Sequence, residues 1–343
     1  MSKKLNIAVI GTGRMGVNHV RVISEMEGVN LVAVVDFNRE LAERVAKKYF
    51  VESVYDKVET MLGKEKIDAA IVATPTSYHY SVGRLCIEHG LHVFLEKPMA
   101  STVKECDELI NLAKEKKLKL MIGHIERFNP VIVKLKEFLN NNLLGDVYYL
   151  ETVRSGPFPK RLYGSKDGVV IDLAVHDLDL IDYLFGKIGQ VYAHHIKTKE
   201  HKQDIYARVM FKTQTGVIGS SEFSWISPKK ERRISVYGDK GMLLGNLLDQ
   251  EVWFFENGDV SIDYSDNYYQ NVLWGRVSEG KVTKYPIKKE EPLKRELEFF
   301  FKLLKKENNI SNELEFDPSY GKRAVDYSLS VLESADRDKI IYF

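Results

Sequence analysis

The fold is decided by the first apolar run and the glycines that follow it, Leu5-Asn6-Ile7-Ala8-Val9-Ile10-Gly11-Thr12-Gly13-Arg14-Met15-Gly16. A run of strand character leads directly into a Gly-x-Gly-x-x-Gly pattern, within which an amphipathic stretch begins. This order is the dinucleotide-binding fingerprint, because the glycines allow a tight turn and let the N–H groups of a helix start face a pyrophosphate. We therefore expect residues 11–16 to hold a dinucleotide cofactor.

The second predicted strand ends at Asp36, about twenty residues after the last glycine of the pattern. An acidic side chain at this place accepts hydrogen bonds from the adenosine ribose and repels a 2′-phosphate. NAD is therefore favoured over NADP as the cofactor. Arg39 leaves one question open, because it either faces a phosphate or lies in solvent at a helix start.

Short β-branched runs alternate with amphipathic stretches as far as residue 123. We predict strands at 5–10, 30–36, 69–73, 92–95 and 119–123, and helices at 15–26, 39–49, 78–89 and 103–117. Strands separated by such helices form a parallel sheet that is covered on both faces. Residues 1–123 are therefore predicted to form a doubly wound α/β domain that binds the cofactor.

The pattern changes after residue 123. Helices are predicted at 129–140, 171–184, 293–307 and 318–336, strands at 147–154 and successively over 190–262, and an edge strand or docking tail at 340–343. Strands that are joined by hairpins rather than by helices form an antiparallel sheet. Residues 124–343 are therefore predicted to form a second, α+β domain.

Composition excludes several classes of protein. The chain has 343 residues, and its 50 Lys and Arg against 49 Asp and Glu give a formal net charge of +1, so no overall positive field favours nucleic acid or an anionic membrane. The first apolar run is too short for a signal peptide or a membrane span. Cys86 and Cys106 lack Cys-x-x-Cys spacing, so we expect buried free thiols in the reducing cytoplasm.

A charged pair, Glu96-Lys97, stands before Pro98 at the carboxyl end of a predicted strand. Open α/β sheets bind their ligands at this edge. Pro98 favours an extended conformation for Lys97, so the lysine is partly positioned before a substrate arrives. The residues alone leave two interpretations: a surface ion pair, or a catalytic lysine close to the nicotinamide.

Asp172 and His176 are four residues apart in the predicted helix 171–184, so both project from one face. A carboxylate beside an imidazole raises its basicity, which suits proton transfer. Two ligands on a helix without a third carboxylate or thiolate make a poor zinc or iron site, so no metal is predicted. Lys97 and His176 are both candidates for the base that takes a substrate's hydroxyl proton.

Two segments of the second domain are candidates for substrate binding. The first contains Arg127 and Asn129, and the second contains Arg154, Lys160, Arg161 and Tyr163. Cations beside aromatic rings suit a diphosphate and a stacked base. The alternative for the second segment is a solvated basic loop.

Over essentially its whole length the chain resembles the Gfo/Idh/MocA oxidoreductases. The resemblance is carried by residues 11–16, Thr74-Pro75 followed by His79, Glu96-Lys97-Pro98, and Asp172-Leu173-Ala174-Val175-His176. It implies an N-terminal Rossmann domain, a C-terminal domain with a large open, mainly antiparallel sheet, and a nicotinamide cofactor. It also implies that Lys97 and His176 flank the reacting carbinol, and that Thr74, Pro75, His79 and Glu96 lie along the cofactor.

Within that family, residues 126–130 and 156–159 are most similar to the members that oxidise the 3-hydroxyl of UDP-N-acetylglucosamine or of its uronic acid. The resemblance implies a 3-keto nucleotide sugar as the product. The neutral sugar is favoured because we identify no additional cation for a uronate. Two alternatives stay open: an NAD-dependent dehydrogenase of inositol or a free sugar, and an NAD redox sensor without enzymatic activity.

The predicted antiparallel sheet also suggests how the protein assembles. Residues 206–211 and 217–225 carry apolar side chains on both strand faces. Large antiparallel sheets often have one solvent-facing side. We therefore expect a homodimer or homotetramer formed through the sheet of the second domain.

Overall fold

The structure is a computed structural model that describes residues 4–159, 167–198, 203–258, 280–305 and 316–343. Two compact units are present. Unit 1 comprises Met1–Phe128, Val170–Tyr183 and Glu291–Ser330, and unit 2 comprises Asn129–Val169, Leu184–Glu290 and Val331–Phe343. The units thus differ from the single boundary predicted at residue 123, because two later segments return to the first unit.

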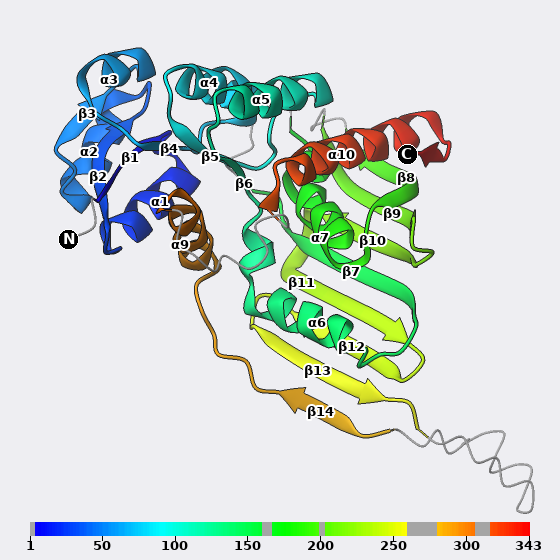
Figure 1. The fold of residues 1–343 in the computed structure, drawn as a ribbon. Coiled ribbons are helices and arrows are strands. Elements are labelled where there is room, and N and C mark those ends of the chain that lie inside the picture. Colours follow the sequence, from blue (N-terminus) through cyan, green and yellow to red (C-terminus); the bar gives the residue numbers. More distant parts are fainter. Residues whose placement is uncertain (1–3, 160–166, 199–202, 259–279, 306–315) are drawn as a thin grey trace, which may run out of the picture. The chain divides into compact units, whose positions relative to one another are not determined.

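Unit 1 contains a six-stranded parallel sheet in the order β3-β2-β1-β4-β5-β6 (Figure 1). Its strands are β1 (Leu5–Ile10), β2 (Val29–Val35), β3 (Ser53–Tyr55), β4 (Ala69–Val72), β5 (His92–Glu96) and β6 (Leu120–Gly123). The winding reverses between β1 and β4, and ligands of open α/β sheets bind at the carboxyl ends of the strands at such a point. The predicted doubly wound sheet is confirmed.

Helices cover both faces of this sheet. They are α1 (Arg14–Ser24), α2 (Arg39–Tyr49), α3 (Val58–Lys64), α4 (Thr76–Glu88), α5 (Val103–Glu115), α9 (Pro292–Lys305) and α10 (Ser319–Arg337), with a 3₁₀ turn, η1 (Ile125–Phe128). The short elements β3 and α3 were not predicted, because a strand of 3 residues and a helix of 7 are too short to show a period.

Alternate strand residues supply two hydrophobic cores. Ile7 and Val9 pack with residues of α1, α2 and α9, whereas Ala8 and Ile10 pack with residues of α3, α4 and α5. The helix α9 thus occupies the place of a Rossmann helix although it comes from the end of the chain. Cys86 and Cys106 are buried free thiols, as predicted, in the second of these cores.

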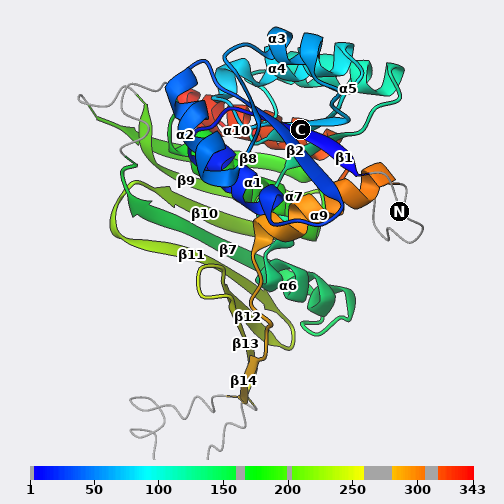
Figure 2. The same cartoon turned by 90° about the vertical axis from the view of Figure 1, so that its left-hand side faces the viewer.

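Unit 2 contains a nine-stranded sheet in the order β14-β13-β12-β11-β7-β10-β9-β8-β15, whose larger strands lie side by side in Figure 2. Its strands are β7 (Val147–Pro157), β8 (Ile188–Lys197), β9 (Asp204–Thr213), β10 (Ile218–Ser224), β11 (Ile226–Gly238), β12 (Gly241–Asn246), β13 (Glu251–Glu256), β14 (Val282–Tyr285) and β15 (Ile341–Tyr342). Every pairing is antiparallel except that of β7 with β10. The predicted mainly antiparallel sheet and its edge strand are confirmed.

Two further helices complete the described chain. Helix α6 (Pro130–Asn140) lies against β12 and β13, and α7 (Val175–Phe185) follows a π-helical turn at Val170–Ala174. Within the described ranges, no helix is long and apolar enough to cross a membrane.

Candidate active site

The turn after β1 leaves room for a phosphate only because it is built from glycine. Gly11 has a φ of +90°, and a Cβ there would lie 2.6 Å from the carbonyl oxygen of Ala73. A Cβ on Gly16 would lie 1.8 Å from the carbonyl oxygen of Gly11. Gly13 caps α1 without a side-chain bond, and its Cβ position has no atom within 4 Å. The N–H groups that begin α1 therefore fit the pyrophosphate of NAD.

Asp36 is fixed at the end of β2 by three hydrogen bonds. Its Oδ2 accepts from the backbone N (2.7 Å) and hydroxyl (2.9 Å) of Thr12, and its Oδ1 accepts from the backbone N of Asn38 (2.9 Å). The carboxylate is thus held where a ribose would bring its hydroxyls. Arg39 donates to Glu43 at 2.8 Å on the exposed side of α2, which supports the solvated interpretation of that arginine.

Phe37 is a candidate cofactor residue that the sequence analysis missed. Its side chain is 88% exposed although it follows Asp36 directly. An aromatic ring left in solvent at this sheet edge offers a flat apolar face for the adenine. In the sequence, Phe37 could have been identified as a cofactor residue because it is an aromatic residue directly after Asp36, at the end of the second predicted strand.

His79 connects the two loops that follow β4 and β5. It is 1% exposed, its Nδ1 lies 2.7 Å from the carbonyl oxygen of Pro98, and its Nε2 lies 2.8 Å from that of Thr74. Burial lowers the pKa of His79, although both carbonyl hydrogen bonds oppose the shift. Pro75 precedes α4 as its N-cap. His79 therefore joins the backbone of the loop after β4, which contains Thr74 and Pro75, to the backbone of the loop after β5. All three predicted cofactor residues lie at the carboxyl end of the sheet.

Glu96 and Lys97 do not form a pair with each other. The Oε1 of Glu96 lies 2.7 Å from the Nε2 of His19 on α1, and His19 is fully buried. Burial opposes ionisation of Glu96, but the His19 hydrogen bond and the charges of His19, Lys97 and His79 outweigh it, so the pKa of Glu96 is lowered. Glu96 therefore faces the interior of unit 1. In the sequence, His19 could have been identified as a site residue by its position one helical turn after the glycine pattern.

Lys97 is held by Asp172. Its Nζ donates to the backbone carbonyl oxygen of Asp172 at 2.8 Å and approaches the carboxylate Oδ1 at 3.3 Å. The two side chains are only 15% and 10% exposed. A partly buried lysine at the carboxyl end of a central parallel strand is a candidate catalytic group rather than half of a surface ion pair.

The helix predicted from Ile171 begins differently in the structure. Asp172 lies in the π-helical turn Val170–Ala174, and α7 starts only at Val175. The prediction that Asp172 and His176 project from one face of a single α-helix stays a prediction, because the turn that carries Asp172 is π-helical. His176 is partly buried on the first turn of α7. Single π-turns in α-helices are frequent at functional sites.

Arg127 and Asn129, both predicted to bind substrate, are held by contacts within the protein. The guanidinium of Arg127 is 2% exposed, donates to Asp179 at 2.8 and 2.5 Å, and lies over the rings of Tyr183 and Tyr320. Asn129 is the N-cap of α6. Its side-chain oxygen accepts a hydrogen bond from the backbone N of Val131, and its side-chain nitrogen donates one to the carbonyl oxygen of Leu247, between β12 and β13.

Arg154 lies within the nine-stranded sheet and is 2% exposed. On β11 the residue directly opposite is Arg232, and on β10 it is Phe223. Two guanidinium groups and an aromatic ring thus share one face of three adjacent strands. Arg232 was not predicted, because strand pairing cannot be read from the sequence at that distance. Lys160, Arg161 and Tyr163 lie outside the described residues.

No group of three or more potential metal ligands occurs in the part of the chain that the structure describes. The aspartates of α7 have other partners. Besides the Arg127–Asp179 pair, Asp182 accepts from Arg323 at 2.6 Å and from the hydroxyl of Tyr327 at 2.8 Å. These carboxylates therefore serve as partners of arginine inside unit 1.

Comparison with known proteins agrees with this geometry. Residues 5–124 match the oxidoreductase family with an NAD-binding Rossmann fold, and residues 132–244 match the GFO/IDH/MocA C-terminal domain. The UDP-N-acetylglucosamine 3-dehydrogenase of Acidithiobacillus ferrooxidans is 30% identical over 256 residues, which cover 74% of this chain and 78% of that protein. The scyllo-inositol 2-dehydrogenase (NAD(+)) of Bacillus subtilis is 28% identical over 274 residues, covering 77% and 80%.

A solved structure of the Acidithiobacillus ferrooxidans UDP-N-acetylglucosamine 3-dehydrogenase has the same fold, with a TM-score of 0.81, 24% identity, and coverage of 97% of this chain and 98% of that one. The matching family models, the glycine cradle for NAD and the partly buried lysine at the end of β5 all describe one kind of enzyme. The chain therefore belongs to the Gfo/Idh/MocA family of NAD-binding oxidoreductases.

Proposed function

We propose that this enzyme oxidises the 3-hydroxyl of UDP-N-acetylglucosamine to the 3-keto nucleotide sugar, with NAD as hydride acceptor. The observation that carries the reaction type is the Lys97–Asp172 pair at the carboxyl end of β5. The observation that favours an anionic, nucleotide-linked substrate is the placement of Arg154 opposite Arg232. Arginines bind phosphate groups in a bidentate manner, whereas a free polyol offers them no charge.

NAD, when bound, accepts the hydride from the carbinol carbon. The residues of this chain have to orient the carbinol and take its hydroxyl proton. Lys97 and His176 are the two groups proposed for that proton, and Asp172 positions Lys97 through both its carbonyl and its carboxylate. The buried Arg154 and the half-buried Arg232 are proposed to bind the diphosphate.

A second candidate is NAD-dependent oxidation of inositol or a free sugar. It is supported by the similarity to scyllo-inositol 2-dehydrogenase (NAD(+)), which is nearly as high as that to the nucleotide-sugar enzyme. The uronic acid of UDP-N-acetylglucosamine is a third substrate to test, because Arg154 and Arg232 could bind a carboxylate as well as a phosphate.

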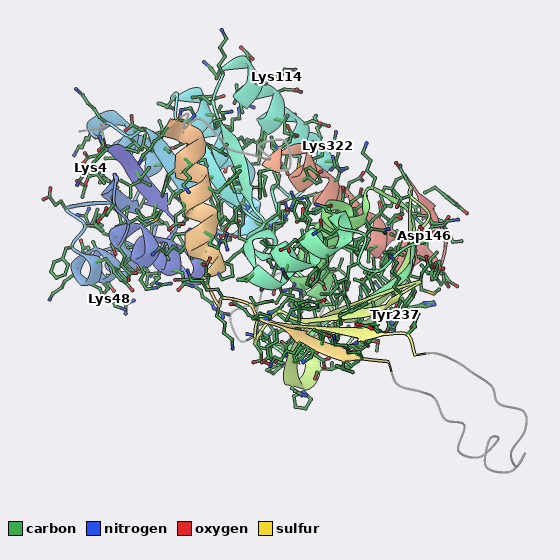
Figure 3. The ribbon with its side chains drawn as sticks, turned by 60° about the horizontal axis from the view of Figure 1, so that its bottom comes forward. Lys4, Lys48, Lys114, Asp146, Tyr237 and Lys322 are labelled. Carbon is green, nitrogen blue, oxygen red and sulfur yellow. The ribbon has the colours of Figure 1, made fainter. Side chains whose placement is uncertain are left out.

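We further propose a homodimer or homotetramer formed through the nine-stranded sheet. Along β9 the side chains of Ala207, Val209 and Phe211 are buried, whereas those of Met210 and Lys212 on the other face are exposed. Tyr237 on β11, labelled in Figure 3, is also exposed. Light scattering at micromolar concentration tests this assembly, and a monomer would refute it.

We also propose that the protein functions in the cytoplasm, because buried free thiols are typical of proteins in that reducing compartment.

The proposed function is tested by incubating purified protein with NAD and one candidate substrate at a time: UDP-N-acetylglucosamine, its uronic acid, and myo- or scyllo-inositol. NADH absorbance measures turnover, and mass spectrometry detects a product lighter by two hydrogens. Addition of 2-oxoglutarate tests whether a retained NADH has to be re-oxidised in place. We expect the highest kcat/KM with UDP-N-acetylglucosamine; a higher value with an inositol would favour the second candidate.

A further inference from the structure

A second buried carboxyl group lies close to Glu96. Glu296 belongs to α9 and is 0% exposed, and neither of its carboxyl oxygens has a hydrogen-bond partner among the described residues. A buried polar group without a partner destabilises the folded state. The reaction proposed above makes no use of this side chain.

A contact between two aromatic rings, one on β5 and one on α9, indicates that Glu296 lies near Glu96. Phe94 and Glu96 lie on the same face of β5, because side chains alternate along a strand. Phe300 and Glu296, four residues apart, lie on the same face of α9. The rings of Phe94 and Phe300 meet edge to face at 5.6 Å. Two residues along a strand and four along a helix each advance about 6 Å. The charge of Glu96 also acts on Glu296, which places the two carboxyl groups near each other.

His19 completes the cluster from the neighbouring helix. Its ring meets Phe94 edge to face at 5.4 Å, and its Nε2 is bonded to the Oε1 of Glu96. Helices α1 and α9 lie against each other beside the sheet, with α9 shown in orange in Figure 3. Glu96 therefore has a partner of opposite polarity on α1 and a second carboxyl group on the side of α9.

We propose that Glu296 is a positioning residue that keeps a proton and offers it to Glu96 through a buried water, so that the two carboxyl groups together hold one negative charge next to Lys97. Two adjacent carboxyl groups in an apolar setting do not both ionise, and one of them keeps its proton. The hydrogen bond from His19 selects Glu96 as the ionised member. A buried water can bridge the pair where the oxygens do not meet directly.

The surrounding charges support this assignment. Burial raises the pKa of Glu296 well above its usual value, and the negative charges of Glu96, Asp179 and Glu126 raise it further. Only Arg127 opposes this rise. The charged groups that act on Glu296 are Glu96 at the end of β5, Glu126 and Arg127 of η1, and Asp179 of α7. His19 and Lys97 act in turn on Glu96, and His124, after β6, interacts with Asp179 and Glu96.

One negative charge beside Lys97 favours the oxidised cofactor, because the nicotinamide ring of NAD⁺ is positive and that of NADH is neutral. Without the proton donor, Glu96 loses part of the stabilisation of its charge. Below neutral pH, where Glu96 then becomes protonated more easily, Glu296→Leu is therefore expected to weaken the binding of NAD⁺ relative to NADH by about tenfold. This inference rests on NAD binding alone and does not depend on the sugar.

The experiment titrates the full chain with NAD⁺ and, separately, with NADH, below and above neutral pH. Glu296→Gln, which keeps a donor of the same shape, should retain the wild-type ratio of the two dissociation constants at neutral pH, as should the control Glu298→Gln on the same helix. Infrared spectroscopy should detect a protonated carboxyl band at neutral pH that Glu296→Gln removes. An unchanged ratio in Glu296→Leu, an equal loss of both cofactors, or the absence of that band would overturn the proposal.

Discussion

The ammonium nitrogen of Lys97 lies 2.8 Å from the backbone carbonyl oxygen of Asp172, and the two residues are 75 positions apart in the chain. The strand end that carries the lysine and the π-turn that carries the aspartate belong to one compact unit. The lysine is thus held by backbone as well as by side chain. Its place is therefore set by the fold before any substrate binds.

Replacing Lys97 by methionine keeps the length of the side chain and removes the ammonium group. If Lys97 acts on the reacting hydroxyl, kcat should fall by about 10²- to 10⁴-fold, the usual contribution of a positioned proton-transfer group. NADH affinity, measured by fluorescence, should change far less. The matched control is Lys104→Met on the surface of α5, where the lysine side chain is 87% exposed. Retained turnover in Lys97→Met would remove the lysine from the mechanism.

Asp36 is expected to set the choice between NAD and NADP. Replacing Asp36 by serine removes the charge that repels a 2′-phosphate, so the ratio of kcat/KM for NAD to that for NADP should fall by about tenfold or more. Arg39→Gln serves as the control, because Arg39 is paired with Glu43 on the surface. A ratio that Asp36→Ser leaves unchanged would show that another residue selects the cofactor.

The Arg127–Asp179 pair is expected to be important for stability rather than for substrate affinity. Both side chains are at most 2% exposed, so Asp179→Ala leaves a buried guanidinium without its carboxylate and should cost about 3–5 kcal/mol of unfolding free energy. Denaturant unfolding measures this loss. The double variant Arg127→Met with Asp179→Leu should recover most of it, since it removes both charges. A cost below about 1 kcal/mol for Asp179→Ala would mean that the pair is solvated.

His124 makes stability depend on pH. Burial lowers its pKa from 6.5 to about 4, although the charge of Asp179 opposes the shift. Between those values the unfolded chain binds a proton that the folded chain excludes, so stability should fall as pH decreases, by at most about 1.4 kcal/mol per pH unit.

Unfolding free energies measured between about pH 7 and 4 test this dependence. In His124→Phe the slope over this range should decrease, whereas replacing the exposed His89 by glutamine should leave it unchanged. Equal slopes in the wild type and His124→Phe would contradict the assignment.

Most of the first unit could be predicted because its signals are local. The glycine pattern, the strand-to-helix spacing and Asp36 all act within about forty residues, and the alternation of apolar runs defines a parallel sheet. The return of α9 to this sheet could not be predicted in the same way. Its residues follow the second domain in sequence, and no period in the chain indicates which sheet they cover.

The predicted site was incomplete for a related reason. Lys97 and Asp172 were each identified by motif, but their contact depends on a π-turn that has no clear sequence signature. The burial of Arg127 was not predicted, because charge is visible in a sequence and burial is not. His19 and Glu296 are ordinary helix residues by pattern, and only the packing of α1 and α9 on β5 shows what they face.

The most direct test of the proposed function follows a deuterium atom placed at C3 of the sugar in UDP-N-acetylglucosamine. Oxidation of the 3-hydroxyl requires that this atom leave as the hydride, so the account predicts deuterated NADH together with an unlabelled 3-keto product, detected by mass spectrometry. Deuterium that stays in the sugar while NADH forms would show oxidation at another carbon. The absence of NADH with this substrate, together with turnover of an inositol, would contradict the nucleotide-sugar assignment.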